Sequence, residues 1–163
     1  LSTMGKAKVL RTKDFNQAID KIQSHGIKVV GSFIFGLEND TREGLEKSRK
    51  FLTKSNLLKI VVNLITPYPG TRYFERLEKE GRLLTKDWSR YSDYESVIEH
   101  ANFRPGELYE LYRDTLRDVS SYDNIFERIH RVYRQWNDLG IVNADRVGPV
   151  LDNLGLHSFA YSL

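Results

Sequence analysis

The sequence contains no cysteine among its 163 residues. This absence excludes disulfide bonds, a thiolate nucleophile, thiolate zinc sites and any iron–sulfur cluster ligated by cysteines of this chain. The four histidines are far apart, and none has the spacing to another histidine or a carboxylate that marks a metal site. Serine-nucleophile, phosphate-loop and dinucleotide motifs are also missing. We therefore predict no catalytic residue and no metal ligand in this chain.

Long hydrophobic runs are missing as well. No segment approaches the roughly 18 consecutive apolar residues of a membrane span, and residues 1–6 lack the apolar stretch of a signal peptide. We therefore expect a cytoplasmic protein. With 40% hydrophobic, 29% charged and 12% aromatic residues, the chain has the composition of a globular protein with a buried core. Its length suits one domain but is short for a complete barrel enzyme, which needs roughly 200 residues or more.

The net charge of +3 is unevenly distributed along the chain. Residues 1–60 carry 12 Lys/Arg and 6 Asp/Glu, whereas the remainder carries 13 Lys/Arg and 16 Asp/Glu. A basic segment can attract an anionic ligand or nucleic acid. Because these cations fall mostly on the polar faces of predicted helices, we interpret them as solvated surface and do not expect nucleic acid as a partner. Nucleic-acid binding is kept as a third hypothesis for the function, behind the two that are given below.

Helical and strand patterns alternate in the first half of the chain. Apolar residues at helical spacing predict a helix from Thr12 that Gly26 ends. Apolar, β-branched runs at 27–35 and 58–65 predict strands buried on both faces of a parallel sheet. Between them, Asp40 begins a capping-box pattern for a second helix. This order predicts an α/β fold with β-α-β crossover units.

The second half is predicted to be mainly helical. Thr71 suits the N-cap of a short helix that ends at Gly81. From Pro105, a suitable first helical residue, a long amphipathic region begins, and Ser120 and Ser121 are expected to divide it into two helices. The aromatic stretch with Trp88, Tyr91 and Tyr94 either covers a substrate pocket or ties the part that contains the strands to the terminal helices.

Two segments lie where a predicted parallel strand ends, residues 32–41 (SFIFGLENDT) and 64–71 (LITPYPGT). In α/β sheets and barrels, ligands bind at this edge. Periodicity alone fits a second interpretation equally well, because residues 33–35 suit the core of a buried strand and Gly36 suits a turn.

The same segments belong to a longer series of motifs, which resembles the latter half of the radical S-adenosylmethionine enzyme barrel. The resemblance spans about residues 2–135 and is greatest to the branch whose members often carry an amino-terminal cobalamin-binding domain, similar to the anaerobic magnesium-protoporphyrin monomethyl ester cyclase. The motifs, in order, are Met4-Gly5-Lys6, His25-Gly26-Ile27, Phe33-Ile34-Phe35-Gly36-Leu37, Asp40-Thr41, Thr66 to Thr71, Leu77 to Leu84 and Asp87-Trp88.

This resemblance implies a partial TIM-type (β/α) barrel over residues 1–86, with two parallel strands, and a mainly helical extension over residues 87–163. In the family, three cysteines spaced C-x-x-x-C-x-x-C bind a [4Fe–4S] cluster, which cleaves S-adenosylmethionine to a 5′-deoxyadenosyl radical. The chain lacks these cysteines. The resemblance therefore implies a carboxy-terminal fragment of an iron–sulfur oxidoreductase, cyclase or methyltransferase-like enzyme, inactive alone. The parent protein would use S-adenosylmethionine and the cluster, with cobalamin as a further candidate cofactor, and act on a small-molecule substrate.

The resemblance also implies which residues contact the adenine of S-adenosylmethionine. The family's G-x-I-x-G-like motif corresponds to Ile34 and Gly36, although Ser32 replaces its first glycine and Glu38-Asn39 replaces the common Pro-Gly. The end of the following strand meets the other face and the edge of the ring. The candidate contacts are Phe33, Ile34, Phe35, Gly36, Leu64, Ile65 and Thr66.

A different class of function remains open. The amphipathic region 105–138 is suited to a helical protein-interaction module, because a long apolar stripe needs a partner. Exposed sheet edges of a fragment also predict self-association, unless the terminal helices cover them.

Overall fold

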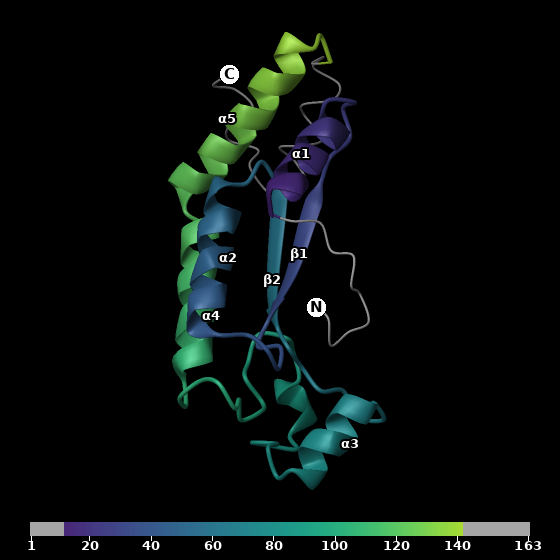
Figure 1. Cartoon of the computed structure of the whole chain (residues 1–163), viewed down its shortest axis with the longest axis vertical. Coiled ribbons are helices and arrows are strands. Elements are labelled where there is room, and N and C mark those ends of the chain that lie inside the picture. Colours follow the sequence, from purple (N-terminus) through teal and green to yellow (C-terminus); the bar gives the residue numbers. More distant parts are fainter. Residues whose placement is uncertain (1–11, 142–163) are drawn as a thin grey trace. The chain divides into compact units, whose positions relative to one another are not determined.

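The computed structural model describes residues 12–141, so the motif at residues 4–6 and the tail beyond residue 141 lie outside the described residues. It confirms the α/β class, with two parallel strands in one sheet. The elements are α1 (Thr12–Gln23), β1 (Val30–Phe35), α2 (Arg42–Lys54), β2 (Lys59–Leu64), α3 (Arg72–Lys79), the 3-10 helix η2 (Trp88–Arg90), α4 (Glu107–Val119) and α5 (Tyr122–Asp138) (Figure 1).

Two compact units make up the described residues. The first contains residues 12–30, 55–59 and 126–141, and the second contains residues 31–54 and 60–125. The second unit includes both loops at the carboxyl ends of the strands. The candidate site therefore lies within one unit.

In the first unit, α1 is hydrogen-bonded to α5. Trp136 Nε1 donates to the carbonyl of Gln23 at 2.8 Å. The Gln23 carbonyl also accepts from the Gly26 N–H at 2.8 Å, so the bond from Trp136 is its second. The buried cluster of the unit is formed by Leu58, Val132 and Trp136.

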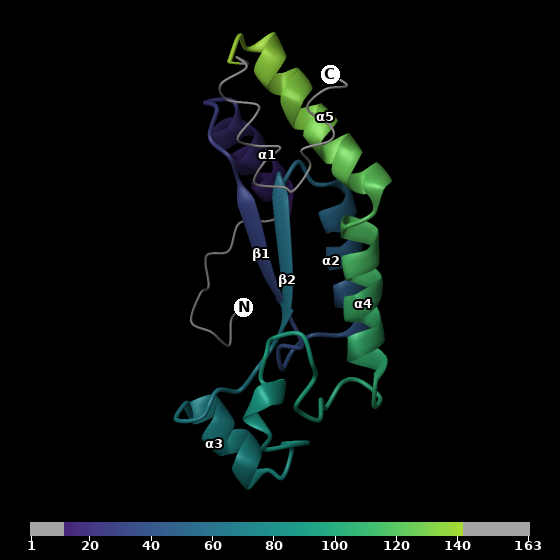
Figure 2. The ribbon, with the colours of Figure 1, turned by 180° about the vertical axis from the view of Figure 1, so that it is seen from behind.

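In the second unit, α2 packs on one face of the sheet and α4 lies beside α2 (Figures 1 and 2). The ring centroids of Phe33 in β1 and Phe51 in α2 are 6.3 Å apart. Leu52 of α2 is fully buried. Arg49 Nε donates to Asp118 Oδ2 at 2.6 Å and so joins α2 to α4.

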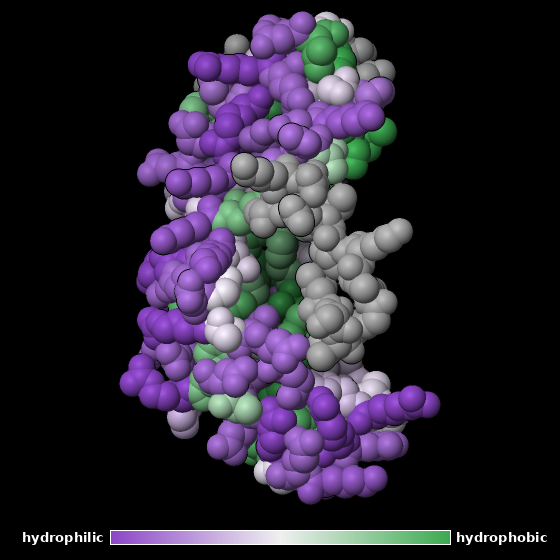
Figure 3. Space-filling view, viewed as in Figure 1, coloured by the Kyte–Doolittle hydropathy of each residue, from purple (hydrophilic) through white to green (hydrophobic). Residues whose placement is uncertain are grey.

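The prediction that the first strand is buried on both faces is wrong. Positions 31, 33 and 35 of β1 are partly or fully buried, whereas positions 30, 32 and 34 are exposed. Side chains of a strand alternate between its faces, so β1 has one covered face and one open face. Ile34, on the open face, is 49% exposed. Figure 3 shows hydrophobic atoms in a hollow beside the largely hydrophilic surface of α2.

Two helices begin later than predicted. Thr41, not Asp40, caps α2, since the Gly44 N–H donates to Thr41 Oγ1 at 3.1 Å. The Asp40 carboxylate is engaged elsewhere, as described below. α4 begins at Glu107 instead of Pro105, because Gly106 takes the left-handed conformation (φ +82°) at its N-cap.

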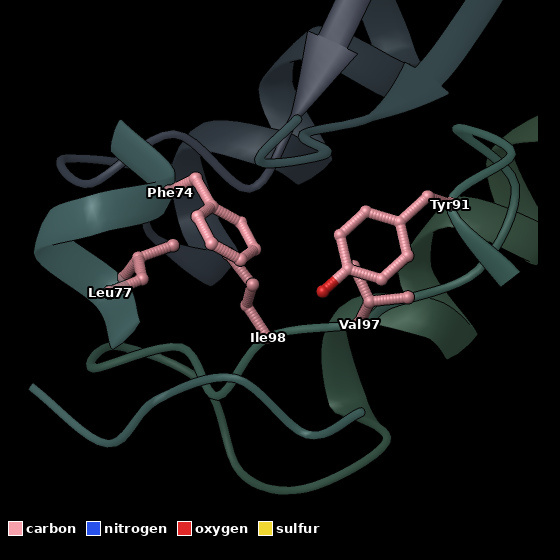
Figure 4. Close-up of a cluster of buried hydrophobic side chains, with 5 residues drawn as sticks. All are labelled: Phe74, Leu77, Tyr91, Val97 and Ile98. Atoms are coloured by element: carbon pink, nitrogen blue, oxygen red, sulfur yellow. The ribbon is translucent and has the colours of Figure 1, made fainter. Parts of the chain in front are cut away.

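The start and the end of α3 agree with the prediction. Thr71 Oγ1 accepts a hydrogen bond from the Phe74 N–H at 3.2 Å, and Gly81 (φ +69°) follows the helix. Tyr91 is buried with the inward side chains of α3, so the aromatic stretch ties α3 to the segment after it. The members of this buried cluster are Phe74, Leu77, Tyr91, Val97 and Ile98 (Figure 4).

The long helical region is divided at Ser120 and Ser121, as predicted. α4 buries its apolar residues in the second unit, so that stripe is already covered there. The residues concerned are Leu108, Leu111, Tyr112 and Val119, and the polar Thr115 is buried with them. Among residues 12–141, no helix is long and apolar enough to cross a membrane.

Candidate functional site

The loop after β1 is organised by one carboxylate. Asp40 Oδ2 accepts hydrogen bonds from the backbone N–H groups of Gly36 and Leu37, both at 2.9 Å. Asn102 Nδ2 donates to the carbonyls of Glu38 and Asp40, at 2.9 and 3.0 Å. Burial raises the pKa of Asp40, and the two amide hydrogen bonds oppose this effect. The N–H groups of Gly36 and Leu37 are thus committed within the loop.

Gly36 is the point of closest approach between this loop and its neighbours. Its φ of +93° is a conformation that side-chain-bearing residues rarely adopt. A Cβ atom at this position would lie 2.7 Å from His100 Cε1, 2.8 Å from Leu108 Cδ2 and 3.0 Å from Ile65 Cγ2. Only glycine therefore fits here without a shift of its neighbours.

At the end of β2, the backbone N–H groups are also hydrogen-bonded within the chain. The Ile65 N–H donates to the Phe35 carbonyl at 2.8 Å, and the Leu64 N–H donates to the Asp93 carbonyl at 2.7 Å. Thr66 Oγ1 donates to the Leu64 carbonyl at 3.3 Å. Successive N–H groups of a strand point in opposite directions, so Asp93 lies on the side of β2 away from β1. The end of that sheet edge is covered.

Asp93 is itself unusual. Its φ is +64°, and among residues 12–141 it is the one non-glycine residue with a positive φ. Tyr68 Oη donates to Asp93 Oδ1 at 2.7 Å, and this hydrogen bond raises the pKa of the Tyr68 hydroxyl. Aspartate tolerates the left-handed region better than most residues. Asp93 takes this unfavourable backbone conformation in a loop that joins the end of β2 to the segment before α4.

The seven predicted adenine contacts do not share one surface. Ile34 lies on the open face of β1, whereas Phe33 lies on the face that α2 covers. Ile65 is half-buried, with Cγ2 close to Gly36. The remaining buried members are Phe35, Gly36, Leu64 and Thr66. Of the seven residues, Ile34 is the most accessible to a ligand.

His100 lies against the Gly36 loop and was not singled out by the sequence. Its ring meets that of Phe103 edge to face, with centroids 6.0 Å apart. Burial lowers the pKa of His100 to about 4, with the cation of Arg82 acting in the same direction and Glu38 opposing it. The imidazole is therefore neutral at pH 7, with one donor and one acceptor nitrogen.

We expect the free energy of unfolding to fall by about 1–2 kcal/mol as the pH is lowered, because charging is easier for His100 in the unfolded chain than in the folded one. This contribution is fully present above pH 6.5 and is lost as the pH falls towards about 4. Urea unfolding at a series of pH values measures it. The variant His100→Gln should have a flatter profile than the wild type. Equal profiles for wild type and His100→Gln would contradict this assignment.

Three residues of this region were not predicted from sequence as site residues. His100 and Asn102 contact a loop more than 60 positions earlier, and no local pattern indicates such a contact. For Asp93, the tolerance of aspartate for a positive φ was the one available signal.

Comparison with known proteins finds similarity to several proteins that are named as methyltransferases or methylases. Bacteriochlorophyllide d C-12(1)-methyltransferase of Chlorobaculum tepidum is 27% identical over 126 residues, covering 77% of this chain and 27% of that protein. An uncharacterized methyltransferase of Pyrococcus horikoshii is 33% identical over 100 residues, covering 60% of this chain and 22% of that protein. The hopanoid C-2 methylase of Rhodopseudomonas palustris is 34% identical over 84 residues, covering 52% of this chain and 16% of that protein.

The chain spans about a quarter of the length of the first relatives. Residues 71–155 match a family described as a domain of unknown function, DUF4070. The matched segment begins at the cap of α3 and includes α4 and α5. Because this match covers more than half of the 163 residues, the chain belongs to the DUF4070 family.

Proposed function

We propose that this chain forms the last β-α units and the helical extension of a radical S-adenosylmethionine methyltransferase, the parent protein. The boundary between the two parts is proposed at residue 86. The names of the relatives support methyl transfer, and the order of motifs along the chain supports the radical S-adenosylmethionine barrel.

The observation that carries this proposal is the open face of β1. Parallel strands are normally buried on both faces, yet Ile34 and Val30 are 49% and 57% exposed. In a closed barrel, the face away from the helices lines the interior. Further strands of the parent protein would therefore cover this face.

A radical S-adenosylmethionine enzyme requires S-adenosylmethionine and a [4Fe–4S] cluster, and the residues of this chain suit the first of these two cofactors. The chain has no cysteine, and residues 12–141 contain no group of three or more histidines and carboxylates that could hold a metal ion. A [4Fe–4S] cluster does not fit here, and we assign no step to it. Cobalamin, which would carry a methyl group, is proposed to bind outside this chain as well.

S-adenosylmethionine fits better. Adenine is flat and is best held by apolar side chains, and Ile34 offers an exposed apolar surface beside the loop that Gly36 begins. The N–H groups of Gly36, Leu64 and Ile65 already have partners. We therefore assign the contact with the face of adenine to Ile34 and do not assign the ring edge to those three amides.

The helical interaction module is less well supported, although Tyr122 and Phe126 of α5 are 77% and 46% exposed. Its premise was an uncovered apolar stripe over residues 105–138. Leu111 and Tyr112 of α4 are 4% and 2% exposed. Val132 and Trp136 of α5 are 2% and 4% exposed.

In the parent protein, Ile34→Ser should raise the KM for S-adenosylmethionine about fivefold to tenfold, because it removes apolar area from the proposed adenine wall. Formation of 5′-deoxyadenosine and calorimetric binding of S-adenosylmethionine measure the effect. Val30→Ser is the matched control, since it changes the same face of β1 four residues towards the amino end.

Two outcomes would contradict the proposal. One is an equal effect of the two substitutions, since only Ile34 lies at the carboxyl end of β1. The other is reductive cleavage of S-adenosylmethionine by the 163-residue chain alone after anaerobic reconstitution with iron and sulfide. The chain alone is expected to show neither iron–sulfur absorption nor cleavage.

A further inference from the structure

We infer that the segment between α3 and α4 forms a binding pocket for an uncharged, largely apolar small molecule. The pocket has a volume of about 630 Å³ and is lined by residues between 84 and 109. It lies entirely within the segment that matches the family of unknown function. Ligand pockets of proteins commonly have volumes of roughly 300–1,000 Å³. The pocket is therefore large enough to hold most of a polycyclic molecule.

Its walls come from ordered backbone. The Leu84 N–H donates to the Val97 carbonyl at 2.9 Å, and the Glu99 N–H donates to the Arg82 carbonyl at 2.8 Å. These bonds join two antiparallel segments on one side of the pocket, and the first turn of α4 forms another side. The apolar lining residues are Leu84, Ile98, Phe103, Pro105, Leu108 and Tyr109.

The charged residues at the pocket disfavour an anionic ligand. Arg90 Nε lies 2.8 Å from Glu95 Oε2, and Arg104 Nε lies 3.6 Å from Glu107 Oε2. Both cations are thus paired within the chain. Glu99 also lines the pocket and makes no ion pair with the residues that the structure describes. An anionic ligand would have to displace a carboxylate and approach Glu99, so the lining favours an uncharged one.

His100 supplies a polar contact. It lines the pocket, and within residues 12–141 its ring nitrogens have no hydrogen-bond partner. The neutral imidazole can therefore donate or accept one hydrogen bond to a hydroxyl or carbonyl of the ligand. Because His100 Cε1 also packs at Gly36, the pocket adjoins the loop at the carboxyl end of β1. If the proposed function is right, the ligand is part of the methyl acceptor, and that identification alone rests on it.

Dye binding to the 163-residue chain tests the pocket without any cofactor. The probes are N-phenylnaphthylamine, which is uncharged, and its sulfonated analogue anilinonaphthalenesulfonate; the fluorescence of both rises in apolar surroundings. We expect one saturable site per chain for the uncharged dye, with an affinity about tenfold higher than that of the anionic dye. Equal affinities would overturn the charge argument.

Matched leucine variants locate the dye. Leu84→Ser, at a lining residue that is 61% exposed, should weaken binding about fivefold, because it removes apolar contact without disturbing the core. Tyr109→Ser should act in the same direction. Leu139→Ser is the control, since Leu139 is 51% exposed and does not line the pocket.

Loss of binding in Ile34→Ser with full binding in Leu84→Ser would place the dye on the open face of β1 and overturn the inference. So would the absence of saturable binding. Neither outcome depends on cleavage of S-adenosylmethionine. Failure of the pocket and failure of the proposed function are therefore distinguishable.

Discussion

Replacement of Gly36 by alanine is expected to lower the free energy of unfolding by about 2–4 kcal/mol, from backbone strain and overpacking together. The φ of +93° is unfavourable for alanine, and the added Cβ would lie within 3.0 Å of His100, Leu108 and Ile65. Urea unfolding, followed by the fluorescence of Trp88 in a Trp136→Phe background, measures the loss in the second unit. Each unit contains one of the two tryptophans, so this background assigns the signal.

Gly70→Ala is the control that separates strain from crowding. Gly70 has a φ of +80°, but a Cβ there would meet no atom within 4 Å. We therefore expect a loss of about 1 kcal/mol, from backbone strain alone. Equal losses for the two variants would show that the contacts around Gly36 are less crowded than the distances indicate.

Replacement of Leu77 by alanine is expected to cost about 3 kcal/mol, since it removes a buried side chain and leaves a cavity. Leu77 is 0% exposed and points into the cluster between α3 and the segment that ends at Ile98 (Figure 4). The same fluorescence experiment measures this loss. The slope of the unfolding transition should stay unchanged if the compactness of both states is preserved.

Leu84→Ala is the matched control for Leu77→Ala. Leu84 is 61% exposed, so its truncation should change the free energy of unfolding by less than about 0.5 kcal/mol. A loss as small as this for Leu77→Ala would mean that the cluster does not stabilise the second unit. Because Leu84 also lines the pocket, this control shows in addition that pocket variants at this position remain folded.

Most helices and both strands could be predicted because their signals are local. Apolar spacing identified α1, the cap residue Thr71 and Gly81 identified α3, and the pair Ser120 and Ser121 marked the break between α4 and α5. The oxygen of Thr71 bonds an N–H only three residues away, so a short pattern is sufficient to predict it. The start of α2 was predicted one residue too early. The Asp40 carboxylate accepts from the amides of Gly36 and Leu37, three and four residues before it, and so does not cap the helix.

The candidate site was predictable only in part. The motif around Ile34 indicated that a strand end lies there, and this is observed. The sequence does not show that Ile34 lies on the open face of β1 and Phe33 on the covered one, because a continuous apolar run has no alternation that would assign residues to faces. His100 became part of the site only through contacts with a loop more than 60 positions away.

The amino-acid sequence by itself determined the absence of cluster ligands, the α/β class and the positions of the strand ends, since each depends on residue identity or on neighbours a few positions apart. The tertiary structure alone decided that one face of β1 stays open, that Asn102 holds the loop after β1, and that His100 is partly buried and neutral. These properties depend on which distant side chains exclude water or supply hydrogen bonds. Burial and pairing of this kind arise only when the chain has folded.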